Sequence, residues 1–281
     1  RKLYHYLAMR LDAHSNLFGI RPSRLESCSP PLLLNAIPKA GTHLVESAVR
    51  ATGCYRHSGL RTLVQRHSSR FRQRLGRLQQ GQYQLAHLAF DEELAMLLGE
   101  LRVRHVLIVR DPRSVVLSRA YYLREMDASH PSHKDFRHLD IDDAIWAAIE
   151  GRGRFLPSLG DVYRDFSGWS NRDDVLLVKF EDMIGTRGSG SRDAQLSAIV
   201  RLLSFIYDAD GTDLSPFFSS AQILDVCRST FDSAALTRAS DRGAFSRYQL
   251  SNEAEQAVVS SVGDFDFGYF SAIASDAGSN C

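Results

Sequence analysis

The clearest chemical pattern lies in residues 38–43, which read Pro-Lys-Ala-Gly-Thr-His and are called the Lys39 turn below. An apolar run, residues 31–37, precedes this turn and an amphipathic stretch, residues 44–51, follows it, which predicts a buried strand, a tight turn and a helix. Backbone N–H groups and the helix dipole attract anions at such a helix start. Gly41 permits close backbone approach, Thr42 supplies a hydroxyl and Lys39 supplies a compact positive charge. The Lys39 turn therefore predicts an anion-binding site.

Lysine is rare in this chain, because only Lys2, Lys39, Lys134 and Lys179 are lysines among 34 Lys and Arg residues. A lysine in the Lys39 turn indicates that a point charge is preferred there over a planar guanidinium. The turn is not a Walker A loop, which requires G-x-x-x-x-G-K-[ST], since Lys39 precedes Gly41. An ordinary glycine-containing turn without a ligand is the alternative.

A second pattern begins where Arg110 follows the apolar residues 106–109. Asp111 is placed to cap a helix and Pro112 to occupy its first position. Ser118 lies about two helical turns beyond Arg110. A guanidinium and a hydroxyl can bind one phosphate together. The alternative is that Arg110 pairs with a nearby carboxylate and that Ser118 is merely a helix residue.

His87 lies at the end of another apolar segment, residues 83–88. A neutral imidazole is a suitable general base for a hydroxyl near pH 7. A structural histidine is the alternative, but a place at the same sheet edge as Lys39 and Arg110 favours catalysis. Glu46, in the helix expected after the Lys39 turn, is the next candidate base.

The candidate residues need elements that bring them together. Apolar runs predict strands at residues 32–37, 83–88, 105–109 and 175–180, and helical patterns lie at 92–101, 113–124, 140–155, 195–207 and 253–262. Strands that alternate with helices predict an α/β fold with a parallel, doubly wound sheet and helices on both faces. Ligands bind at the carboxyl ends of the strands in such sheets, where Lys39, His87 and Arg110 are expected.

Length and composition favour one domain over residues 1–281, with a helical extension at 1–30 and a flexible tail at 270–281. The chain is 44% hydrophobic and has a net charge of +1. No run approaches the roughly 20 apolar residues that span a membrane. The four cysteines contain no C-x-x-C pair. Scattered thiols and the absence of a secretory pattern at the start of this sequence predict a cytoplasmic protein.

Four motifs occur in a characteristic order: P-K-x-G-T at 38–42, x-H-L at 86–88, R-x-P-R-x-x-x-x-S at 110–118 and F-E-D-M at 180–183. In order and spacing they resemble the sulfotransferases that use 3′-phosphoadenosine 5′-phosphosulfate (PAPS), over residues 32–250. The resemblance implies a P-loop-like fold and transfer of a sulfuryl group from PAPS to a hydroxyl or amine. It also implies that 3′,5′-ADP is the product and that no metal is required.

The same resemblance assigns roles to individual residues. His87 corresponds to the catalytic base, and Lys39 would stabilise charge on the leaving group. Arg110 and Ser118 would bind the 3′-phosphate. The whole expected nucleotide-binding set is Lys39, Ala40, Gly41, Thr42, His43, Arg110, Ser118, Phe180, Ser229, Phe231, Arg242 and Gly243.

Three positions depart from the family pattern. Leu44 stands where an adenine-stacking Trp is common, Phe180 replaces a Tyr, and Asp241 replaces the first Arg of a late R-K-G phosphate loop. These changes put adenine stacking and the late phosphate contact in question. They indicate a divergent branch of the family, which we expect to be bacterial.

An arginine-rich interval bears on the acceptor, which is expected to be a small molecule, a glycan or a lipid headgroup. Residues 47–90 contain no Asp or Glu. The arginines there are Arg50, Arg56, Arg61, Arg66, Arg70, Arg72, Arg74 and Arg77. They favour an anionic acceptor, and the alternative is a solvated face balanced by acids elsewhere.

Further expectations concern other partners and other functions. An apolar stripe of Leu3, Tyr4, Leu7 and Leu11 is compatible with peripheral membrane contact, or with packing on its own domain. No nucleic-acid partner is expected, and the sequence does not indicate an oligomeric state. Two other functions fit part of the pattern: a P-loop kinase or nucleotide phosphotransferase, which would need Mg²⁺, and a non-catalytic protein that binds polyanions.

Overall fold

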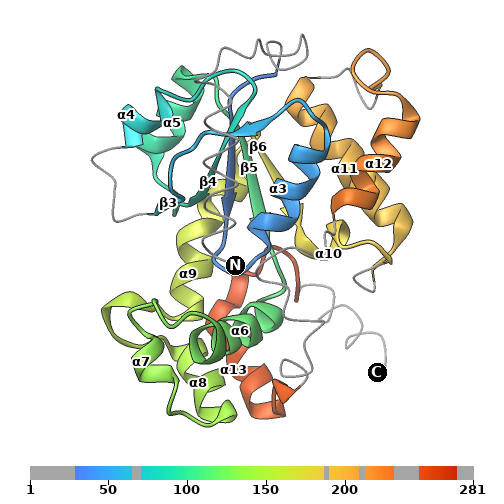
Figure 1. Cartoon of the computed structure of the whole chain (residues 1–281). Helices are drawn as coiled ribbons and strands as arrows, with labels where there is room; N and C mark the ends of the chain where they lie inside the picture. The colour runs from blue at the N-terminus through green and yellow to red at the C-terminus, as the bar shows by residue number, and fades with distance from the viewer. Residues whose placement is uncertain (1–28, 65–70, 187–189, 209–212, 231–246, 271–281) are drawn as a thin grey trace, which may run out of the picture. The chain divides into compact units, whose positions relative to one another are not determined.

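The computed structural model describes residues 29–64, 71–186, 190–208, 213–230 and 247–270 (Figure 1). The expected tail after residue 270 and nearly all of the expected N-terminal extension lie outside the described residues. So do three expected site residues, namely Phe231, Arg242 and Gly243. Within the part of the chain that is described, no helix has both the length and the apolar composition needed to cross a bilayer.

The chain divides into two compact units. Unit 1 comprises Arg1–Ala36, Gly41–Val109 and Arg172–Thr237. Unit 2 comprises Ile37–Ala40, Arg110–Asn171 and Arg238–Cys281. The expectation of a single domain over the whole chain stays a prediction.

Unit 1 is built on a parallel sheet. Its strands are β1 (Leu32–Ala36), β2 (Arg56–His57), β3 (Leu63–Val64), β4 (Gln82–His87), β5 (Arg104–Val109) and β6 (Val175–Lys179). The order is β2-β4-β1-β5-β6, and β3 pairs with β4. Every pairing is parallel. The predicted fold class is thus confirmed, and the four predicted strands are β1, β4, β5 and β6.

Helices cover both faces of this sheet. They are α3 (Thr42–Ala51), α4 (Phe71–Leu75), α5 (Glu92–Glu100), α10 (Phe180–Met183), α11 (Arg192–Tyr207) and α12 (Ser220–Thr230). In Figure 1, α3, α11 and α12 lie on one side of the sheet, and α4 and α5 lie on the other. Because both faces are covered, β1 is a continuous apolar run apart from Asn35, and all five of its residues are buried.

The register of the central strands determines where the candidate residues lie. Ala36 pairs with Ile108 on β5, and Asn35 pairs with Ala86 on β4. The carboxyl ends of β1, β4 and β5 therefore meet at one edge of the sheet. The chain leaves unit 1 at this edge twice, directly after Ala36 and directly after Val109.

The described part of unit 2 consists of helical segments and loops. Its α-helices are α6 (Pro112–Tyr121), α7 (His133–Phe136), α8 (Ile141–Glu150), α9 (Leu159–Ser167) and α13 (Asn252–Val262). A π-helical segment, η2 (Tyr122–Met126), continues α6, and three 3₁₀ segments are η3 (Gly153–Phe155), η4 (Gly168–Asn171) and η7 (Gly263–Phe265).

Two predicted helices differ from the observed ones. The helix expected at 113–124 is α6 followed by the π-helical turn of η2. The helix expected at 140–155 ends at Glu150, because Gly151 adopts a φ of 81° that ends the helix. The predicted cap of α6 is confirmed, since the Asp111 side chain accepts a hydrogen bond from the Arg113 N–H and Pro112 follows.

Candidate active site

The Lys39 turn is closed by a hydrogen bond of 2.9 Å from the Ala40 N–H to the Ile37 carbonyl. Gly41 then forms the N-cap of α3 with a φ of 97°, in the left-handed region. A Cβ atom on Gly41 would lie 2.3 Å from Cδ2 of Phe180, the first residue of α10. Both the backbone angle and the space therefore require glycine. The ring of Phe180 therefore packs directly against the Gly41 backbone, which a side chain at position 41 would prevent.

Lys39 is half-buried, and desolvation is the main cause that lowers its pKa from 10.5 to about 7. The nearby Arg110 charge lowers the pKa further, and Asp127 opposes both effects. The Lys39 Nζ atom lies 3.6 Å from the centroid of the Tyr122 ring. The Arg110 charge thus disfavours the charged form of Lys39, and a bound anion would stabilise both cations.

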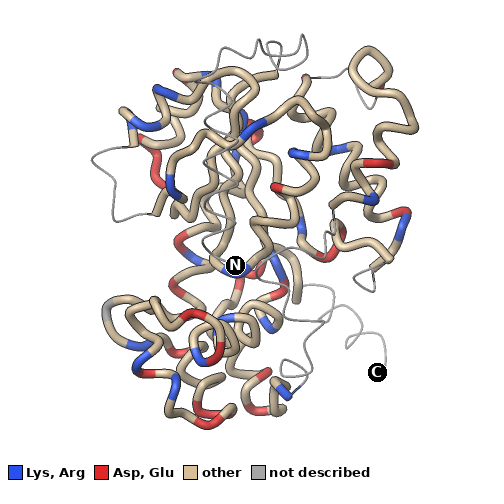
Figure 2. Tube along the Cα trace, viewed as in Figure 1, with Lys and Arg blue, Asp and Glu red and all other residues tan. Residues whose placement is uncertain are grey.

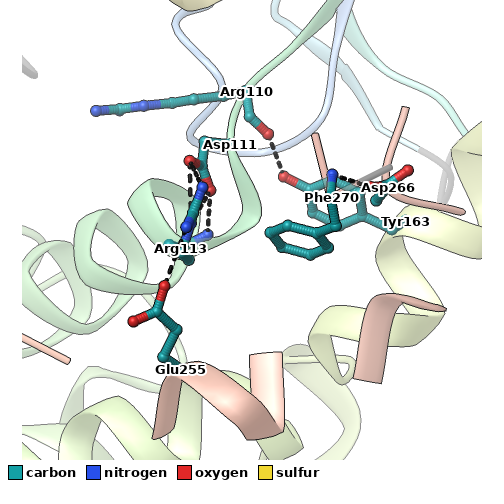
Figure 3. Close-up of polar contacts among 7 residues, drawn as sticks. All are labelled: Arg110, Asp111, Arg113, Tyr163, Glu255, Asp266 and Phe270. Carbon is teal, nitrogen blue, oxygen red and sulfur yellow. Dashed lines mark hydrogen bonds and ion pairs between the residues drawn. The ribbon is translucent and has the colours of Figure 1, made fainter. Parts of the chain in front are cut away.

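Arg110 directly follows β5 and contacts the Lys39 turn. Its Nη1 donates a long hydrogen bond of 3.4 Å to the Lys39 carbonyl. Its own carbonyl accepts a hydrogen bond of 2.5 Å from the Tyr163 hydroxyl, which fixes the backbone at this point (Figure 3). The structure therefore brings Lys39 and Arg110 together, as the sequence predicts. Ser118 is buried in α6 of the same unit.

Asp111, the residue after Arg110 in the sequence, binds the side chain of Arg113. Asp111 accepts hydrogen bonds from Nε and Nη2 of Arg113, at 2.8–3.1 Å. Glu255 accepts a further one from Arg113 Nη1 at 3.0 Å, and Phe270 lies under the guanidinium with its ring centroid 5.3 Å away. Figure 3 shows the Arg110 side chain pointing away from this group. Arg113 thus holds the start of α6, and Arg110 extends elsewhere.

His87, the last residue of β4 in unit 1, has a defined tautomer. Its Nδ1 lies 2.7 Å from the Ala36 carbonyl at the end of β1. A carbonyl oxygen can only accept a hydrogen bond, so Nδ1 carries the hydrogen. Nε2 is then the ring atom that can take a proton. This geometry suits a general base.

Asn35 fixes the segment that follows His87. Its Nδ2 donates to the Leu88 carbonyl at 2.9 Å, and its Oδ1 accepts from the Leu88 N–H at 2.8 Å. Asn35 is completely buried in β1, and these hydrogen bonds give both polar groups of its amide a partner inside the protein. The amide therefore fixes the backbone that carries His87.

Replacing Asn35 with alanine is expected to lower the free energy of unfolding by roughly 2–4 kcal/mol. The reason is that two buried backbone groups of Leu88 lose their partner, at about 1–3 kcal/mol each. Urea denaturation of Asn35→Ala beside wild type measures the change. Asn35→Asp keeps the acceptor but loses the donor, so it serves as the comparison. Equal stability of wild type and Asn35→Ala would contradict this account.

Glu46, the next candidate base, is held as a carboxylate in unit 1. Tyr83 donates to its Oε1 at 2.7 Å, and His43 Nδ1 lies 2.7 Å from its Oε2. Burial opposes ionisation of Glu46. The effect of burial is outweighed by the hydrogen bond and charge of His43, the hydrogen bond of Tyr83 and the charge of His57. The pKa of Glu46 therefore falls to about 2. A carboxylate of so low a pKa is a weak base, which leaves His87 as the better candidate.

The other expected nucleotide residues of unit 1 lie on three helices. Thr42 and His43 open α3, Phe180 opens α10, and Ser229 lies near the end of α12. α12 packs on α3, and α10 also contacts α3. The Phe180 ring lies directly against the Lys39 turn, at Gly41.

Comparison with solved structures supports the fold. The chain is similar to the crystal structure of mouse sulfotransferase SULT7A1 complexed with PAP, with a TM-score of 0.58 and 16% sequence identity over 84% of this chain and 85% of that one. The chain has the sulfotransferase fold. Two structures of retinol dehydratase are also similar, one with androsterone and inactive cofactor PAP and one with retinol and PAP. Each has a TM-score of 0.48 and 14% identity over 92% of this chain, and over 85% and 86% of the retinol dehydratase chains respectively.

Sequence comparison does not find this similarity. No protein-family model matches the chain, and no curated protein matches it. The sulfotransferase fold is therefore established by the course of the backbone. The roles of individual residues remain predictions.

Several residues in this sulfotransferase fold were not singled out by sequence reasoning. Asn35 holds Leu88, Tyr163 holds the Arg110 carbonyl, and Tyr122 contacts the Lys39 ammonium. A polar Asn inside the apolar run of β1 was the one available signal, because a buried amide needs partners. Tyr122 and Tyr163 carry no signal in the sequence, since each acts on a residue far along the chain.

Proposed function

We propose that this protein transfers a sulfuryl group from PAPS to a hydroxyl or amine of an acceptor. The observation that carries the proposal is the half-buried Lys39 side chain beside Arg110, in the turn that follows β1 of a sulfotransferase fold. Two neighbouring, half-buried cations suit a ligand with several negative charges. Gly41 forms the N-cap of α3, whose first backbone N–H groups and helix dipole favour an anion.

The residues present fit PAPS as the donor. Lys39, Gly41, Thr42 and His43 would hold the 5′-phosphosulfate, and Arg110 and Ser118 would hold the 3′-phosphate. PAPS supplies a sulfuryl group on a good leaving group. The described residues offer charge, hydroxyls and backbone N–H groups for this, and the proposal calls for no metal ion.

Two side chains carry the chemistry in this proposal. His87 Nε2 accepts the proton of the acceptor hydroxyl, while Nδ1 stays bound to the Ala36 carbonyl. Lys39 stabilises the negative charge that develops on the departing 3′,5′-ADP. By analogy with phosphoryl transfer, positioning and electrostatic stabilisation supply most of the rate.

A thermal-shift comparison tests the donor. We expect 3′,5′-ADP to raise the melting temperature, because a ligand at 100 times its Kd adds about 2.7 kcal/mol to the folded state. ATP with Mg²⁺ is the matched ligand for a kinase, and 5′-AMP controls for the missing 3′-phosphate. A larger shift with ATP and Mg²⁺ than with 3′,5′-ADP would favour phosphotransfer and contradict the proposal.

Replacing Arg110 with alanine is expected to weaken 3′,5′-ADP binding roughly 10- to 100-fold while affecting 5′-AMP far less. A hydrogen bond to a charged group is worth roughly 1.5–3 kcal/mol, and Arg110 is assigned to the 3′-phosphate alone. Isothermal titration with both nucleotides measures the two affinities. Ser118→Ala should show the same preference with a smaller loss. Equal weakening of both nucleotides would place Arg110 on the 5′ side or in the fold.

The acceptor is proposed to be a small molecule, glycan or lipid headgroup, with anionic compounds preferred. Figure 2 shows basic residues along α4, where Arg72 and Arg74 lie in the last turn. Arg72 also pairs at 3.2 Å with Glu100 of α5, and both side chains are largely exposed. An exposed pair of this kind contributes little, so the arginines of α4 keep most of their attraction for an anion. Arg66 and Arg70 lie outside the described residues.

A further inference from the structure

The Lys39 ammonium lies against two side chains that the proposed reaction does not use. Tyr122 presents its ring to the Nζ atom, at 3.6 Å from the centroid. The Tyr122 hydroxyl in turn donates a hydrogen bond of 2.6 Å to Oδ2 of Asp127. An aromatic face attracts a cation most strongly where water is excluded. The Asp127 carboxylate, which accepts this hydrogen bond, increases the electron density of the Tyr122 ring. The attraction between the ring and the ammonium is therefore stronger.

A π-helical turn brings Tyr122 and Asp127 together. The Asp127 N–H donates to the Tyr122 carbonyl at 3.0 Å, five residues back, at the end of η2. Side chains three or four residues apart face each other on an α-helix, whereas those five apart do not. The wider turn of the π-helix is therefore needed to pair this phenol with this carboxylate. Such turns often occur at functional sites.

Asp127 is anchored on its other side. It is only 8% exposed, and its Oδ1 accepts hydrogen bonds from the Ser129 N–H at 3.2 Å and from the Ser129 hydroxyl at 2.6 Å. Both carboxylate oxygens therefore accept hydrogen bonds. This anchoring keeps the carboxylate and, through it, the Tyr122 ring in a fixed position.

The charges around Lys39 show why such support matters. Burial and the Arg110 charge both lower the pKa of Lys39, and Asp127 is the group that raises it. With these effects together the pKa is about 7, so the amine is close to losing its proton at neutral pH. A cation–π contact favours the charged form as well.

We propose that Tyr122 and Asp127 are positioning residues that hold the Lys39 ammonium in place and keep it protonated before a donor binds. The use of a charged Lys39 rests on the proposed function, whereas the holding of Lys39 rests on the contacts described above. The two parts can be tested separately.

Nuclear magnetic resonance of protein labelled with carbon-13 lysine measures the protonation of Lys39 directly. The chain has only four lysines, Lys2, Lys39, Lys134 and Lys179, so the spectrum is simple, and Lys39→Arg assigns the signal. We expect the titration midpoint of Lys39 to fall by roughly one pH unit in Tyr122→Leu and in Asp127→Asn. Tyr122→Phe keeps the ring and loses the hydroxyl, so a smaller fall in the same direction is expected. If Tyr122→Leu fails to fold, Tyr122→Phe and Asp127→Asn still decide the question.

Tyr121→Leu is the matched control. Tyr121 is the preceding buried tyrosine, and its ring packs edge-on against Tyr248 at 5.4 Å. Its loss should lower stability without moving the Lys39 midpoint. An unchanged midpoint in Tyr122→Leu and Asp127→Asn, or an equal change in Tyr121→Leu, would overturn the proposal.

The pH dependence of turnover then separates the two ideas. If the reaction with PAPS requires a protonated Lys39, kcat/KM for PAPS should fall above the pH at which Lys39 is half-titrated. This alkaline limb should move to lower pH in the same variants by the same amount as the resonance. A shifted resonance in a protein that neither binds 3′,5′-ADP nor turns over PAPS would support the holding role and refute the proposed function.

Discussion

Replacing Lys39 with methionine is expected to lower turnover by a factor of roughly 10²–10³ and, at the same time, to stabilise the folded protein at neutral pH. Methionine keeps the length of the buried stem and removes the charge. The loss of a charge partner for the departing group costs roughly 3–4 kcal/mol of transition-state stabilisation. Steady-state kinetics with PAPS and any acceptor found by screening measures the loss. Turnover near wild type would contradict the role of Lys39.

The gain in stability follows from the pKa of Lys39. In the unfolded chain the pKa is 10.5, and in the folded protein it is about 7. Between these values the unfolded state binds more protons, so wild-type stability rises with pH across this window, and the full cost of burying the charge applies below it. Each unit of pKa corresponds to about 1.4 kcal/mol. The advantage of Lys39→Met should therefore be largest at or below pH 7 and disappear towards pH 10.

Lys39→Arg is the companion variant, because it keeps a positive charge. We expect it to recover only part of the activity, since a planar guanidinium does not replace a compact ammonium. Urea denaturation at pH 6 and pH 9 gives the stability difference for each variant. A Lys39→Met protein less stable than wild type at pH 6 would show that the contact with Tyr122 outweighs the cost of burial.

Replacing His87 with alanine is expected to lower kcat by a factor of roughly 10²–10⁴ while leaving the affinity for 3′,5′-ADP close to wild type. Loss of a general base has an effect of this size. His87 Nδ1 is bound to the Ala36 carbonyl, so Nε2 is the atom assigned to the acceptor proton. Single-turnover kinetics measures the chemical step, and isothermal titration measures nucleotide binding.

His87→Gln and Glu46→Gln provide the comparison for His87. Glutamine can still donate to the Ala36 carbonyl but cannot take a proton, so His87→Gln should be nearly as inactive as His87→Ala. Glu46→Gln should retain far more activity, because the pKa of Glu46, about 2, makes its carboxylate a poor base. A collapse of 3′,5′-ADP affinity in His87→Ala would instead assign His87 to the fold or to the nucleotide.

The sequence by itself determined the central sheet and the Lys39 turn. β1 is apolar apart from Asn35, β5 and β6 are apolar apart from their ends, and β4 is apolar apart from Gln82, Gln84 and His87. Such segments are visible without a structure. Gly41 and the Asp111–Pro112 cap are equally local signals, since each acts on its own stretch of backbone. The short strands β2 and β3 were not predicted, because two residues form no pattern.

The tertiary structure decided which side chains act on the candidate residues. Asn35 reaches Leu88 only because β1 and β4 pair in this register. Tyr122 contacts Lys39 because of the packing within unit 2. It binds Asp127 because of a π-helical turn, which the sequence pattern did not predict. The charge state of Lys39 likewise depends on burial and on Arg110 and Asp127, which are distant in the chain. Local propensity determines strands, turns and caps, whereas pKa values and contacts between distant residues arise only once the chain has packed.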